Sequence, residues 1–173
     1  MTSTMTPGFS YWRATILSGC IALACAAGPP AAAASGPFIG FPGSWDGTGK
    51  IRIGDKTERI RCNATYSLQN SSGSDVVLHL SCASDSYKFD LAGDFQADAG
   101  NHISGNWSER SRGVAGTASG IARGDRFQLH VDSAPISGSI IMVTRGRSQS
   151  VTIDTIGTED KISASITLHR GSR

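Results

Sequence analysis

Residues 61–82 read RCNATYSLQNSSGSDVVLHLSC, and this stretch can fold back on itself about Ser72. In such a hairpin Cys62 lies opposite Cys82. The apolar residues of the two strands also oppose each other in pairs, namely Ala64 and Leu80, Tyr66 and Leu78, and Leu68 and Val76. Directly opposed residues of antiparallel strands lie about 4.5 or 5.5 Å apart at Cα, within reach of a disulfide. The stretch therefore predicts a hairpin with a defined register, an apolar inner face and a Cys62–Cys82 disulfide.

The same alternation of apolar and polar residues continues on both sides of this hairpin. It is clearest in residues 87–95, 103–107, 127–131 and 162–168. Alternation with period two is typical of strands that have one wet and one dry face, and no convincing 3.6-residue apolar repeat is present. Hairpin-sized turn signals separate the stretches. We predict an all-β protein, a single up-and-down antiparallel barrel of about eight to ten strands, with a β-sandwich as the alternative.

Small residues occupy both faces of residues 113–120, GVAGTASG. Folding the chain at Ser111 places Ala115 opposite Trp107. One interpretation is that small residues make room for the Trp107 indole, and another is that glycine lets a barrel strand bend sharply.

The first 34 residues have the pattern of an export signal. Arg13 precedes a short apolar run over residues 14–27, and small residues follow near Ala34. This pattern predicts a secretory signal peptide at 1–34, an N-terminal arm at 35–43 and the barrel at 44–173. A bacterial lipoprotein lipidated at Cys20 is the alternative. Export to the periplasm or the medium would leave two cysteines, which pair by default in an oxidising compartment.

The charge balance limits the partners that the chain can have. Its formal net charge is +2, from 16 Lys and Arg against 14 Asp and Glu. Such a balance argues against nucleic acid or any other polyelectrolyte bound through bulk charge. Nothing after the signal is apolar enough to form a transmembrane segment. The sequence does not indicate an oligomeric state.

Gly43-Ser44-Trp45 opens the first predicted strand, and Arg170 closes the last. This arrangement resembles the calycin superfamily, which includes lipocalins, fatty-acid-binding proteins and avidins. The resemblance implies that Trp45 packs at the closed base of the barrel beneath Arg170, its cation–π partner. The lipocalins' second and third motifs and their C-terminal helix are not evident. Residues 61–66, 82–89, 105–109 and 112–114 also resemble a group of exported bacterial β proteins, a likeness that brings no mechanism.

A calycin-like barrel implies a ligand held in its mouth. The inward, apolar residues that would line it are Tyr66, Leu78, Phe89, Leu91, Phe95, Ile103, Trp107, Phe127, Leu129 and Ile140. Barrels of about eight strands can hold one small ligand. The alternative is that the same side chains pack against each other and leave no cavity.

Arginine is the most prominent polar feature of the turns. Because alternate turns of a meander lie at one end, Arg123 and Arg126 share a rim with Arg145 and Arg147. Such a cluster could hold phosphate, sulfate or an acidic polymer. The alternative is that these arginines only keep strand edges and turns soluble.

The sequence gives little support for catalysis or for a metal site. Most of the four histidines fall on outward positions, and they lack a metal-ligand spacing. Asp90 and Asp94 share a wet face, and Glu109 and Asp46 are assigned to the surface near strand ends. No Gly-x-Ser-x-Gly nucleophile elbow is present. We predict no cofactor and no metal.

These observations favour an exported, non-enzymatic binding domain that holds a small apolar or amphipathic ligand. A second hypothesis is a protein–protein role with an envelope protein, such as protease inhibition by an inserted arm, residues 35–42. A plug that closes the base of the barrel is the alternative interpretation of this arm. An enzyme working in the barrel lumen is the third and weakest hypothesis, because strand parity places almost no ionisable group inside.

Overall fold

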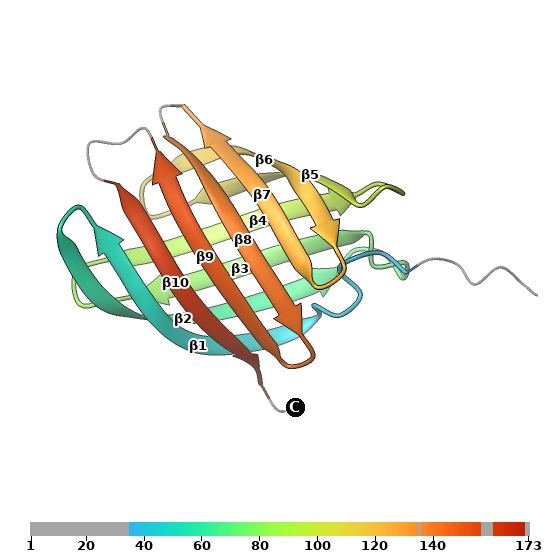
Figure 1. The fold of residues 1–173 in the computed structure, drawn as a ribbon, viewed down its shortest axis with the longest axis horizontal. Helices are drawn as coiled ribbons and strands as arrows, with labels where there is room; N and C mark the ends of the chain where they lie inside the picture. Colours follow the sequence, from blue (N-terminus) through green and yellow to red (C-terminus); the bar gives the residue numbers. More distant parts are fainter. Residues whose placement is uncertain (1–34, 135, 157–160, 172–173) are drawn as a thin grey trace, which may run out of the picture. The chain divides into compact units, whose positions relative to one another are not determined.

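A computed structural model describes residues 35–134, 136–156 and 161–171, which form a closed antiparallel β-barrel (Figure 1). The strands are β1 (Gly43–Ile53), β2 (Lys56–Leu68), β3 (Asp75–Ala83), β4 (Lys88–Ala97), β5 (His102–Glu109), β6 (Val114–Arg123), β7 (Arg126–Ser133), β8 (Ile136–Arg145), β9 (Ser148–Ile156) and β10 (Ile162–Arg170). Each strand pairs with its neighbours in sequence, and β1 pairs with β10 to close the ring. The predicted up-and-down barrel is therefore confirmed, and the β-sandwich alternative is wrong.

Alternating burial shows why these segments are strands. Along β2, buried Ile60, Cys62, Ala64 and Tyr66 alternate with exposed residues. No helix is present in the described residues, so none there could cross a membrane. The predicted signal peptide, with Cys20 and Cys25, lies outside the described residues.

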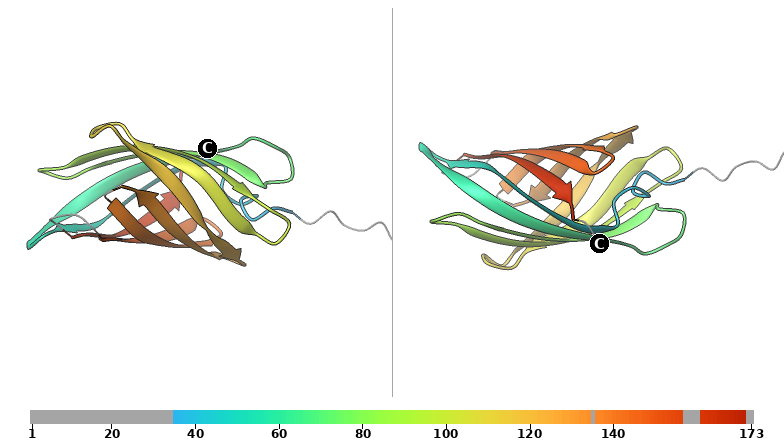
Figure 2. Two further views of the ribbon diagram at one scale, coloured as in Figure 1. Left: turned by 90° about the horizontal axis from the view of Figure 1, so that it is seen from above. Right: turned by 90° about the horizontal axis from the view of Figure 1, so that it is seen from below.

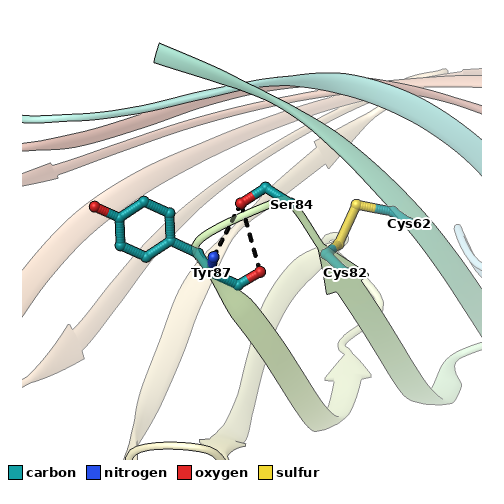
Figure 3. The surroundings of a disulfide bond; sticks show 4 residues. All are labelled: Cys62, Cys82, Ser84 and Tyr87. Carbon is teal, nitrogen blue, oxygen red and sulfur yellow. Dashed lines mark hydrogen bonds between the residues drawn. A yellow bond between two sulfur atoms is a disulfide. The ribbon is translucent and has the colours of Figure 1, made fainter. Parts of the chain in front are cut away.

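The β2–β3 hairpin has the predicted register. Cys62 pairs with Cys82, and the three apolar pairs behind them are those predicted from the sequence. The two cysteines form a disulfide across a Cα–Cα distance of 4.1 Å, which confirms the predicted bridge (Figure 3). Just beyond it, the Ser84 N–H donates to the Tyr87 carbonyl at 2.8 Å and closes the next turn. A disulfide of this kind is typical of an oxidising compartment.

The predicted β5–β6 register is wrong by one residue. Trp107 pairs with Gly116 rather than with Ala115. The turn has four residues, 110–113, and ends at Gly113 with φ 65°, so the centre of the hairpin falls between two residues. A side chain on Gly116 would clash with the Asp132 carbonyl of β7, so glycine is needed here for close approach of two strands.

Alternate turns gather at the two ends of the barrel. We call the end with the turns after β2, β4, β6 and β8 the base, and the end with the other turns the mouth. Residues 35–42, which we call the arm, lie at the base, as both views of Figure 2 show in blue. The arm is held there because the Gly36 and Phe38 N–H groups donate to the carbonyls of Ser72 and Gly73.

Candidate functional site

Aromatic side chains from the arm close the base of the barrel. Phe38 and Phe41 are 3% and 2% exposed, and both pack against Phe127 with ring centroids 5.8 and 4.9 Å away. Phe41 also meets Tyr66 edge-on at 5.1 Å. The arm is therefore a plug. A role of the arm in protease inhibition stays a prediction, although its two aromatic anchors are used inside the barrel.

Trp45 and Arg170 lie together beside this plug. The Trp45 indole N–H donates to the Phe41 carbonyl at 2.9 Å, and the Arg170 guanidinium carbon lies 4.7 Å from the centre of the Trp45 ring. Arg170 also donates to the Gly40 carbonyl. The first strand, the last strand and the arm thus meet at one buried tryptophan, which is 1% exposed.

A short polar chain crosses the apolar base. The Tyr66 hydroxyl donates to Gln149 Oε1 at 2.8 Å, and Gln149 Nε2 donates to Thr144 Oγ1 at 2.9 Å. Burial raises the pKa of Tyr66, and the hydrogen bond to Gln149 opposes this rise only in part. Tyr66, Gln149 and Thr144 are thus partnered with one another, so this chain of hydrogen bonds is part of the packed base.

The ten predicted lining residues separate into two groups. Tyr66, Ile103 and Phe127 are buried in the packed base, so they do not face a ligand at the mouth. The other seven, which are partly exposed although they point inward, are Leu78, Phe89, Leu91, Phe95, Trp107, Leu129 and Ile140. The same partial exposure is found at five further inward residues, namely Leu80, Val131, Val151, Ile153 and Ile162. We call the interior space of the barrel the lumen. In a closed barrel, an inward side chain reaches solvent only through an open end or through this lumen.

Two glycines on one wall of the lumen leave room for an aromatic ring to lie against the backbone. A Cβ placed on Gly93 would lie 2.5 Å from the Phe95 ring, and one placed on Gly105 would lie 2.6 Å from it. The ring therefore lies flat over two glycines of β4 and β5 instead of extending toward the barrel axis. The Trp107 indole N–H likewise donates to the Thr117 carbonyl in the neighbouring strand, at 3.1 Å.

A buried carboxylate and an arginine mark the mouth. Glu109 is 7% exposed and accepts hydrogen bonds from the N–H groups of Asp90, Ser111 and Arg112 at 2.9, 3.0 and 2.8 Å. The Arg112 guanidinium lies 3.6 Å from the Glu109 carboxylate and 4.6 Å from the centre of the Phe89 ring. Burial acts to raise the pKa of Glu109, but the backbone donors outweigh it and hold the pKa below its usual value.

The assignment of Glu109 to the surface is therefore wrong. Its position follows the parity of Ile103 and Trp107, which point inward on the same strand. That parity was the available signal, and the polar character of the residue masked it. Asp46, Asp94 and the four histidines are exposed, as expected. The described residues contain no group of three or more side chains that could hold a metal ion.

The four rim arginines do lie at the base end and are all exposed, but two of them have partners inside the protein. Arg145 Nε donates to the Asp125 carboxylate at 2.5 Å, and Arg147 donates to the Arg170 carbonyl at 2.8 Å. Arg123 and Arg126 are directly paired across the β6–β7 hairpin. An anion site on this rim remains a prediction.

A polar groove of about 480 Å³ lies on the outer wall over β4, β5 and β6, and sequence reasoning did not identify it. It is lined by Asp94, Gln96, Ser104, Gly105, Asn106, Thr117, Ala118 and Ser119. These residues lie on the wall whose inner side carries Phe95. The groove is therefore separate from the apolar lumen.

Comparison with solved structures supports the fold. The barrel is similar to the S-type phycobiliprotein lyase CPES from Guillardia theta. The TM-score is 0.59 at 11% sequence identity, and the match covers 79% of this chain and 91% of that one. At this identity the likeness concerns the barrel fold alone. No protein-family model matches the sequence, and no curated protein matches it.

Proposed function

We propose that this calycin-like barrel is a non-enzymatic binding protein that holds one small apolar or amphipathic ligand in the mouth half of its lumen. One observation carries the proposal: apolar side chains that point into a closed barrel are partly exposed to solvent. Barrels of about eight strands are only just wide enough to hold one small ligand, and ten strands enclose a wider interior.

The two ends of the barrel support a site with one opening. The arm and its aromatic contacts fill the base, whereas the mouth carries Phe89 beneath the Arg112 guanidinium. A ligand entering there would bury its apolar part against Leu91, Leu129 and Ile140 and would keep a polar group near Arg112. This arrangement suits an amphipathic molecule.

The lumen enzyme finds less support than ligand binding. A general acid or base that works near neutral pH needs a pKa close to the working pH. The pKa of Glu109 is shifted in the other direction, and three backbone N–H groups occupy its carboxylate. We therefore assign Glu109 to holding the β5–β6 turn.

Filling the lumen tests the proposal. Leu129→Trp adds volume inside the barrel, and Gln128→Trp adds the same ring at the neighbouring, exposed position. With a fluorescent amphipathic probe such as anilinonaphthalene sulfonate, we expect Leu129→Trp to weaken binding at least tenfold and Gln128→Trp to leave it unchanged. Native mass spectrometry of protein from its own host should show a bound small molecule.

Stability distinguishes a hollow barrel from a packed one. Inserting a large side chain into a packed core costs about 1–3 kcal/mol, whereas filling an open lumen costs little. The proposal fails if Leu129→Trp lowers the free energy of unfolding by this amount, or if both variants bind the probe like the wild type.

A further inference from the structure

Basic side chains are distributed unevenly over the outer wall of the barrel. In the ten strands, every Lys or Arg that is neither the first nor the last residue of its strand belongs to β1 or β2. These residues, which are all exposed, are Lys50, Arg52, Arg59 and Arg61. Strands β4, β7 and β9 carry Asp94, Asp132 and Asp154 instead. The small net charge of the chain therefore conceals a positive side.

These cations form one oblique line across the wall. Lys50 and Arg59 are directly paired and form its centre, from which Arg61 lies two residues further toward the base on β2, and Arg52 two residues further toward the mouth on β1. Beyond Arg52, the exposed Lys161 precedes β10, and its carbonyl accepts a backbone N–H of the β1–β2 turn at 3.2 Å. We call these five residues the basic line. It runs from β10 across β1 to β2, which lie side by side in Figure 1, and it extends about 20 Å along the strands.

The charge of the basic line is not neutralised within the described part of the chain. Like charges directly opposed across a strand pair, as at the centre of this line, are destabilising. Elsewhere Arg110, Arg112 and Arg145 each lie within 4.0 Å of a carboxylate, but no described carboxylate lies that close to any cation of the line. Asp46 on β1 is paired with Asn63 and so lies beside the line and not on it. Uncompensated cations on a rigid sheet make a surface suited to anions.

The borders of the basic line are uncharged and mostly carry hydroxyl groups. Apart from its central pair, the residues directly paired with Lys50, Arg52 and Arg61 across the strands are Thr48, Thr57, Ala83, Ser163 and Ser165. The aromatic residues of β1, β2 and β10 are Trp45 and Tyr66, and both are buried inside the barrel. The positive charge is therefore confined to a narrow strip that has polar borders and no aromatic ring on its outer side.

We propose that the basic line binds a linear acidic polysaccharide whose charges are carboxylates or sulfates. Three of its cations are arginines, whose planar guanidinium groups can contact such a group through two hydrogen bonds. The bordering hydroxyl groups can bind sugar hydroxyls. A membrane plane would also meet the borders, where positive charge is lacking, and single-stranded nucleic acids stack on aromatic rings, which these strands keep inside. The line lies on the outer wall, so this binding does not depend on whether the lumen holds a ligand.

The experiment compares two matched double variants. Lys50→Gln with Arg59→Gln removes the centre of the basic line, and Arg123→Gln with Arg126→Gln removes a directly paired basic couple from the base rim. Both variants lose the same charge. Affinity for fluorescently labelled heparin, a linear sulfated polysaccharide, is measured by fluorescence anisotropy at several salt concentrations. Single-stranded oligothymidylate and vesicles that contain phosphatidylglycerol are tested in parallel. All proteins are recovered from the same host in the same processed form, so any N-terminal segment contributes equally.

We expect the affinity of the wild type for heparin to fall with salt at a logarithmic slope of about −4, because each contact on a polyanion contributes about 0.7–0.9. The Lys50/Arg59 variant should show a slope shallower by about 1.5 and, at about 0.1 M salt, about thirty-fold weaker binding. The rim variant should change the affinity by less than about twofold, since distant exposed charges are screened at this salt concentration.

An equal loss of heparin binding in both variants, or a loss in the rim variant alone, overturns the proposal. It is also overturned if oligothymidylate or the anionic vesicles bind the wild type more tightly than heparin does at equal concentrations of negative charge. The first result would indicate a nucleic acid as the partner, and the second a membrane.

Discussion

At the residue scale, Glu109 determines how the mouth is built. Its carboxylate joins two adjacent strands and the turn that follows, because it accepts from Asp90 on β4 and from Ser111 and Arg112 after β5. A buried carboxylate is stable only where donors replace its water. The turn that positions Arg112 over Phe89 therefore depends on this one ionised group.

We expect Glu109→Gln to lower the free energy of unfolding by about 1–3 kcal/mol, because hydrogen bonds to a charged group are replaced by bonds to a neutral amide. Urea unfolding at pH 7 measures this. Asp94→Asn, which removes an exposed carboxylate on the neighbouring strand, is the control and should have little effect. Equal effects of the two changes would contradict the role assigned to Glu109.

The stabilising effect of the Glu109 carboxylate should depend on pH. The pKa of Glu109 is lower in the folded protein than in the unfolded chain. Its contribution to stability is therefore complete above the ordinary glutamate pKa of about 4.3 and is lost as the pH falls through the lowered value. The difference between wild type and Glu109→Gln should shrink below about pH 4.

At the scale of the elements, the arm acts as a plug through its aromatic residues. Phe38→Ala or Phe41→Ala should each cost about 3–5 kcal/mol, as truncation of a buried phenylalanine usually does. Ile39→Ala is the internal control, because Ile39 is 50% exposed and should change stability by less than about 0.5 kcal/mol. Thermal unfolding of the three variants distinguishes a plug from a loosely attached segment. Similar melting temperatures for all three would show that the arm is not part of the fold.

The elements also show where sequence reasoning succeeds. The β2–β3 register could be predicted because two cysteines and three apolar pairs specify the same alignment. The β5–β6 register could not, because Gly113, Val114, Ala115 and Gly116 are all small and a shift of one residue changes little in the pattern. Turn geometry decides the register there.

The candidate site is predicted less completely than the fold. Strand parity identifies the residues that point inward. It does not indicate which of them are covered by other side chains at the base and which of them face the lumen. Tyr66 and Phe127 are removed from the lumen by Phe41, which comes from a segment without strand pattern. Such packing is a tertiary contact that periodicity does not encode. The placement of Trp45 beneath Arg170 followed from a resemblance and not from any pattern.

At the scale of the whole molecule, the disulfide limits the unfolded chain more than the folded one. Cys62 and Cys82 are already aligned by their strands, and they are separated by 20 positions in the sequence. We expect Cys62→Ala with Cys82→Ala to lose about 3 kcal/mol, the value that the chain-entropy model gives for such a loop. Chemical denaturation of the double variant, compared with the oxidised protein, measures the loss. An unchanged midpoint would mean that the bridge is redundant.

The ring is closed by the ladder between β1 and β10, in which Trp45 pairs with Arg170. Every other ladder joins neighbours along the chain and can form as soon as its hairpin exists, whereas this one must bring together the two extremes of the domain. Closure therefore waits for the final strand. Until that strand arrives, β1 offers a bare edge to any other extended chain, so a barrel truncated before residue 162 should aggregate during synthesis.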